Sequence, residues 1–118
     1  MYAGPPREVV RAEMMALAEV FKALGDPIRL EIVQRLSRGE AVTIGGVSGD
    51  LGVTRQGARK HLQVLVDAHV VRLEPKGRDV HVRLEAKPLE DAKEFIAEVE
   101  RRWDGRLEAL RQFVEDNP

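Results

Sequence analysis

Polar and basic side chains recur along residues 54–68 at positions that a helix would place on one face and its flanks: Arg55, Gln56, Arg59, Lys60 and Gln63. Arginine, lysine and glutamine carry N–H donors that bind phosphate oxygens and base edges in the major groove of DNA. Thr54 precedes them and is suited to cap a helix by accepting a backbone N–H. The residue types and their spacing predict a nucleic-acid-binding surface.

The apolar residues of the same stretch indicate how that surface is held. Ala58, Leu62, Leu65 and Val66 follow the i, i+4, i+7, i+8 spacing of a helix that packs one stripe against a core. A short helix over 43–50 and a glycine-containing turn over 51–53 precede it. Together these elements predict a helix-turn-helix over 43–68. The three glycines of 43–50 weaken its first helix by roughly 1 kcal/mol each.

A second basic element follows, at residues 70–85. Residues 80–84 alternate apolar and polar side chains, as in a half-buried strand, and residues 70–74 supply its partner. The loop 75–79 has Gly77 for the turn and carries Lys76 and Arg78 at its tip. A basic hairpin tip by itself is explained equally well by solubility. Directly after a helix-turn-helix, it favours a "wing" that contacts DNA.

The charge distribution supports this interpretation. The chain has a net charge of −1, but residues 54–87 hold eight basic and four acidic side chains. That segment therefore carries +4, which leaves −5 for the remainder. A positive surface on an acidic body suits a protein that binds DNA locally.

Helical periodicity extends over three further segments, residues 7–24, 27–37 and 88–115. Asp26 and Pro27 are typical of a helix start. The last helix would span roughly 40 Å at 1.5 Å per residue, longer than this small domain needs to cover its core. We therefore expect homodimerisation through 7–24 and 88–115. The alternative is an ordinary amphipathic helix folded against its own domain.

Composition limits the other function classes. At 118 residues, 43% hydrophobic and 33% charged, we expect a single domain, 1–118, that is mainly α with a small β-hairpin. The chain has no cysteine and no long apolar run, so we expect a cytoplasmic protein without disulfides or membrane contact. No motif of an enzyme or a cofactor site is present, so no catalytic residue is predicted.

The histidines do not form a metal site in this reading. His61 and His69 are eight residues apart, about 12 Å along a helix, which is too far to share one ion. His61 is expected to be packed or to face a phosphate. A cation held by carboxylates across the dimer axis remains open, as does a small-molecule effector near Met14, Met15 and Trp103. Core packing is the alternative role for those three side chains.

The assembled segments resemble a known bacterial family. Residues 21–36 (FKALGDPIRLEIVQRL), residues 51–65 (LGVTRQGARKHLQVL) and Gly77-Arg78 in the hairpin are similar to the ArsR/SmtB-type repressors. The resemblance implies a winged-helix homodimer that represses transcription from a near-palindromic operator. Metal-sensing members carry cysteines on the helix before the turn, or histidine and carboxylate ligands on the last helix. This chain has no cysteine, and its last helix has no histidine. The resemblance is thus to a subgroup without an obvious metal site.

The sequence therefore predicts a sequence-specific transcriptional repressor. Double-stranded DNA and a second copy of the chain are its expected partners, with no cofactor. The expected base-reading residues are Arg55, Gln56 and Arg59, and the phosphate contacts are Thr54, Lys60, Lys76 and Arg78, with Gln63 on the same face. A winged-helix module that binds only proteins is the alternative. Such a module would expose apolar or acidic residues on the second helix of the helix-turn-helix.

Overall fold

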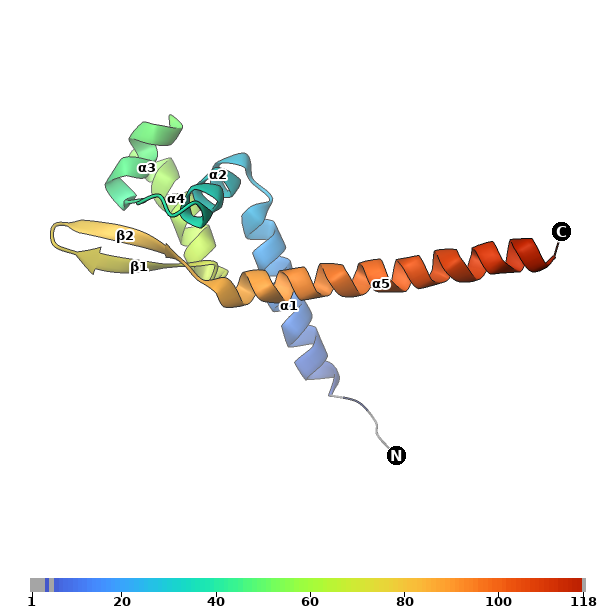
Figure 1. The fold of residues 1–118 in the computed structure, drawn as a ribbon. Helices are drawn as coiled ribbons and strands as arrows, with labels where there is room; N and C mark the ends of the chain where they lie inside the picture. The colour runs from blue at the N-terminus through green and yellow to red at the C-terminus, as the bar shows by residue number, and fades with distance from the viewer. Residues whose placement is uncertain (1–3, 5, 118) are drawn as a thin grey trace.

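The structure is a computed structural model, and it describes Gly4 and residues 6–117. Five helices and one antiparallel hairpin follow each other in this part of the chain (Figure 1): α1 (Arg7–Leu24), α2 (Pro27–Ser37), α3 (Ile44–Leu51), α4 (Arg55–Asp67), β1 (Val71–Lys76), β2 (Asp79–Leu84) and α5 (Ala86–Asp116). This order is that of a winged helix. It confirms the mainly α fold with a small hairpin that the sequence predicts.

Side-chain caps begin three of the helices. Asp26 Oδ1 accepts from the backbone N–H of Ile28 at 2.8 Å, and Pro27 occupies the first position of α2. Thr43 and Thr54 cap α3 and α4, each accepting a backbone N–H three residues on, at 3.0 Å. Local sequence therefore sets where these helices start, because each cap satisfies an N–H that has no partner within its helix.

A small core joins the helix-turn-helix to the hairpin. It consists of buried aliphatic side chains from every element: Val20, Ala23, Ile32, Val47, Ala58, Leu62, Leu65, Ala68, Val70, Val71, Val82 and Ala92. The predicted stripe of α4 contributes its Ala58, Leu62 and Leu65, which leaves the opposite face of α4 exposed. Gly52, with φ of +66°, makes the tight turn between α3 and α4.

The hairpin is longer than the sequence indicates. The strands were expected over 70–74 and 80–84 around a five-residue loop, but β1 and β2 run to Lys76 and Asp79 and leave only two residues at the tip. Pro75 lies within β1, opposite Val80. A proline is tolerated there because β1 is an edge strand, where the missing N–H breaks no further ladder. The wing is consequently a paired two-stranded ribbon up to its two-residue tip.

The last helix begins two residues before the expected Pro88, which occupies its third position. At 31 residues, α5 is about 46 Å long. Its first half packs on α1, where the rings of Phe21 and Phe95 lie 5.9 Å apart. Its second half projects away from the rest of the chain (Figure 1). No helix among the described residues combines the length and the apolar character needed to cross a membrane.

The cap of α3 gives a first testable prediction. Because Gly45, Gly46 and Gly49 give α3 little intrinsic helix stability, its start depends on Thr43. Replacing Thr43 with alanine should lower the free energy of unfolding by about 1 kcal/mol, measured by urea denaturation. Thr43→Ser, which retains the hydroxyl, is the matched control and should stay near wild type. Equal stability of the alanine variant would show that the core alone holds α3.

Candidate nucleic-acid interface

The polar face of α4 is exposed to solvent as the sequence predicts. The side chains of Arg55, Gln56, Arg59, Lys60 and Gln63 are all exposed, with Thr54 exposed at the N-terminus of the helix. The apolar face of the same helix is buried in the core. The structure thus presents a continuous basic and amide-bearing surface, free of large apolar side chains, along the first three turns of α4.

The two ends of this face differ. Gln63 Nε2 donates to Asp67 Oδ1 at 2.7 Å, so its amide is already engaged within the helix. At the other end, Thr54 Oγ1 is 3.0 Å from the N–H of Gly57. A Cβ at Gly57 would lie 3.1 Å from that hydroxyl oxygen, which makes glycine the easiest residue to accommodate. Free donors therefore concentrate in the N-terminal half of α4.

Ion pairs divide the basic side chains of residues 54–87 into two groups. Arg72 NH1 donates to Glu85 Oε1 at 2.6 Å, Arg83 lies 3.4 Å from Glu74, and Lys87 lies 2.6 Å from Asp91. The hydrogen bond to Glu85, together with the charge of that carboxylate, raises the pKa of Arg72. These three cations are thus neutralised by carboxylates on β1, on α5 and at Glu85, the residue between β2 and α5.

The other five have no such partner in the described part of the chain. No carboxylate oxygen lies within 4.0 Å of the charged nitrogens of Arg55, Arg59, Lys60, Lys76 or Arg78. Three lie on α4, and two lie at the tip of the hairpin, where both are exposed. The unneutralised charge of the segment is therefore confined to the two places that the sequence analysis selected for DNA contact.

A polar junction behind α4 was not anticipated. His61 was expected to be packed or to face a phosphate; its side chain is 22% exposed, and its Nδ1 lies 3.0 Å from Arg29 NH1. Burial raises the pKa of the nearby Asp26. Hydrogen bonds from the backbone N–H groups of Arg29 and Ile28 and the charge of Arg29 outweigh this effect, so the pKa of Asp26 lies below its ordinary value. The sequence signal was the short segment Asp26-Pro-Ile-Arg29, read only as a helix start.

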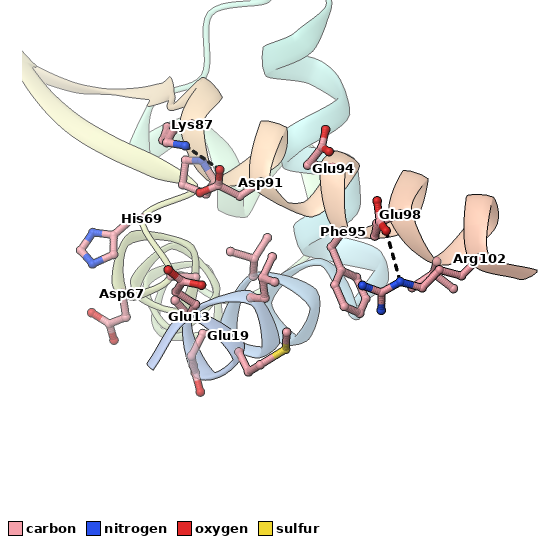
Figure 2. A pocket seen from close by; sticks show the side chains of 17 residues that line it. Glu13, Glu19, Asp67, His69, Lys87, Asp91, Glu94, Phe95, Glu98 and Arg102 are labelled. Carbon is pink, nitrogen blue, oxygen red and sulfur yellow. Dashed lines mark hydrogen bonds and ion pairs between the residues drawn. The ribbon is translucent and has the colours of Figure 1, made fainter. Parts of the chain in front are cut away.

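A groove of about 850 Å³ runs between α1 and α5 (Figure 2). Met14, Leu17, Phe95 and Val99 contribute its apolar lining, and charged side chains surround it, including the Lys87–Asp91 and Glu98–Arg102 ion pairs. Of the three residues considered for an effector, only Met14 lines this groove. Among the described residues, no group of three or more histidine, cysteine, aspartate or glutamate side chains is placed to hold a metal ion.

The sequence and the fold both match known regulators. Residues 24–74 match a family described as Helix-turn-helix domain. The chain is 30% identical over 73 residues to the transcriptional repressor SdpR of Bacillus subtilis, covering 62% of this chain and 80% of that protein. A solved ArsR-like transcriptional regulator from Rhodococcus sp. RHA1 aligns with a TM-score of 0.75 and 30% identity, over 86% of this chain and 95% of that one.

A third match is a winged helix-turn-helix DNA-binding domain from Mycobacterium bovis, described as homodimeric and as part of a possible ArsR-family regulator. It aligns with a TM-score of 0.62 and 25% identity, over 92% of this chain and 95% of that one. With the exposed basic face of α4 and the wing in place, these matches define the class of protein. The chain belongs to the ArsR family of winged helix-turn-helix proteins, and it is a DNA-binding transcriptional regulator.

Proposed function

We propose that this regulator is a homodimeric repressor that occupies a near-palindromic operator in a promoter and blocks transcription by occlusion. The observation that carries the proposal is that, within residues 54–87, the cations without an ion-pair partner lie only on α4 and at the wing tip. The relative SdpR is described as a transcriptional repressor, which supports the direction of regulation. Such a repressor acts where the promoter DNA is, in the bacterial cytoplasm.

Each α4 would enter the major groove of one half-site, and the two half-sites would lie about 34 Å apart or a multiple of that distance. Arg55, Gln56 and Arg59 would read base edges, since their free donors lie in the exposed N-terminal half of the helix. Phosphate oxygens would be bound by the remaining donors, Thr54, Lys60, Lys76 and Arg78. Gln63 has a lesser role in this scheme because Asp67 already engages its amide.

The exposed apolar stripe of α5 supports the dimer. Beyond the part that packs on α1, five large apolar side chains are each about half exposed or more: Trp103 (59%), Leu107 (47%), Leu110 (59%), Phe113 (64%) and Val114 (60%). They recur every three to four residues and so share one face of the helix. Large exposed patches of this kind are typical of interfaces. We propose that α1 and α5 of a second copy cover them. The matched domain from Mycobacterium bovis is described as homodimeric, which supports a dimer but does not name its interface.

The proposal predicts that DNA binding needs no metal. We would incubate the purified, chelator-treated protein with random duplexes, select the bound fraction and sequence it. Enrichment of a twofold-symmetric consensus is the expected result, and it would identify the operator. Enrichment only after zinc is restored would reveal a metal site formed across the dimer. Failure to enrich any sequence in both conditions would favour the protein-interaction module.

The wing gives a separate prediction about salt dependence. Lys76→Ala and Arg78→Ala should each weaken binding to all duplexes and reduce the slope of log affinity against log salt by about one phosphate contact. Arg83→Ala is the matched control, because Glu74 already pairs with that wing arginine. Titrations by fluorescence anisotropy at several salt concentrations measure the slopes. If the Lys76 and Arg78 variants keep the wild-type slope, the wing does not contact DNA.

A further inference from the structure

Three elements of the chain meet at the side chain of Arg29, which lies on α2. Its Nε donates to the carbonyl oxygen of Ala23 at 2.7 Å, and its NH2 donates to that of Lys22 at 3.2 Å, both at the end of α1. Its NH1 lies 3.0 Å from Nδ1 of His61, which belongs to α4. One guanidinium thus connects α1, α2 and α4.

The chemistry of the pair assigns the proton on the histidine. A guanidinium carries only donors and stays charged in proteins, so at 3.0 Å the Nδ1 of His61 has to be the acceptor. The ring is therefore neutral, with its proton on Nε2. Asp26 Oδ1 lies 3.7 Å from the same nitrogen, beyond hydrogen-bond distance, and it is occupied by the N-terminal N–H groups of α2.

This contact has a special place among those of α4. In the described part of the chain, it is the one side-chain hydrogen bond that joins α4 to another helix. The remaining side-chain packing of α4 is apolar, through the buried Ala58, Leu62 and Leu65 and the partly buried Val64 and Val66. Apolar packing is non-directional and tolerates small rotations and shifts. A hydrogen bond from a guanidinium is directional, so it restricts both the rotation and the shift of the helix.

The residues that surround His61 in the sequence connect this contact to DNA binding. Arg59 and Lys60 precede it on α4 and point away from the core. A small rotation of the helix would displace both side chains relative to the groove. We propose that Arg29 and His61 are a positioning pair that holds α4 in the orientation that reads bases. This inference rests on the proposed reading role of α4.

The test removes the acceptor and then restores it. His61→Leu lacks any acceptor, whereas in His61→Asn the side-chain oxygen can occupy the region of Nδ1 and accept from Arg29. Affinities for the selected operator and for a random duplex are measured by fluorescence anisotropy. We expect His61→Leu to lose about 10-fold on the operator and to change less than about twofold on random DNA. His61→Asn should recover most of the operator affinity.

A variant of Arg29, the donor in the contact, tests the same inference independently of the His61 variants. Arg29→Gln removes the guanidinium and should show the same selective loss of operator affinity. Arg38→Gln changes an exposed arginine at the end of the same helix and serves as its control. Thermal unfolding and the oligomeric state are recorded for every variant. Only variants that melt cooperatively, with the wild-type oligomeric state, enter the comparison.

Three results would overturn the inference. The first is a folded His61→Leu or Arg29→Gln variant with wild-type preference for the operator. The second is an equal loss of affinity on operator and random duplex, and the third is a His61→Asn variant that does not recover the operator affinity lost by His61→Leu. The wild-type protein itself separates this inference from the proposed function. If wild type has no operator preference, the repressor proposal fails, and the pair then has no reading helix to position.

Discussion

Replacing Trp103 and Leu107 together with glutamate should convert the proposed homodimer to a monomer and lower operator affinity by more than about 100-fold. Both side chains are about half exposed in the isolated chain, so the change leaves the core of each protomer intact. In the dimer they would be buried, and two carboxylates in an apolar interface carry a large desolvation cost. A monomer also loses the advantage of two linked half-site contacts, which typically amounts to 10²–10⁴ in affinity.

Light scattering coupled to size-exclusion chromatography measures the mass, and fluorescence anisotropy measures the affinity. Gln112→Glu is the matched control, because residue 112 lies on the side of α5 opposite the apolar stripe at 100° per residue. It should stay dimeric and keep the operator affinity. A double variant that remains a dimer would show that the stripe of α5 is not the interface.

The second large effect concerns base reading. Gln56→Ala and Arg59→Ala should each cost roughly 1–3 kcal/mol on the operator, about 5- to 150-fold, if each contact is bidentate. The loss should vanish at operator variants that lack the contacted base pair, because no specific contact remains there. Competition with single-base operator variants in an anisotropy assay measures this pattern. Gln63→Ala should have the smaller effect, since the Gln63 amide is hydrogen-bonded to Asp67.

Gln34→Ala and Arg38→Ala are the matched controls, since both residues are exposed, one on α2 and one at its C-terminal end, and neither belongs to α4. They should leave base preference unchanged. If Gln56→Ala or Arg59→Ala loses the same affinity on the operator and on random duplex, that residue does not contact bases. It would then be assigned to the phosphate backbone.

Local features made much of the fold predictable. The start of α2 follows from Asp26 and Pro27, and the starts of α3 and α4 follow from two threonine caps, because a cap acts within three residues. The spacing of apolar side chains on α4 predicted its buried face, since that spacing depends only on helix geometry. The ends of the hairpin were placed wrongly because Pro75 reads as a loop residue. Pairing with Val80 across the ribbon keeps it in the strand.

The candidate site was predictable in its residue types, but the grouping of its charges was not. The sequence shows eight cations in residues 54–87. The pair of Lys87 and Asp91 is local, since the two residues are four apart on α5. Arg72 is neutralised by Glu85 only because the fold brings the start of β1 beside the end of the hairpin, across 13 positions of the chain. The five cations without such partners are those in the predicted contact set, which supports that set and leaves its test to the variants above.

By itself, the sequence determined the helix boundaries set by caps, the amphipathic stripes and the donors along α4, because each depends on residues within one or two turns. The tertiary structure alone decided that Arg72 and Arg83 are paired across the hairpin, how far the wing remains a ribbon, and that Arg29 meets His61 across 32 positions of the chain. Such contacts depend on the relative placement of whole elements. That placement follows from the packing of a shared core, which no local pattern specifies.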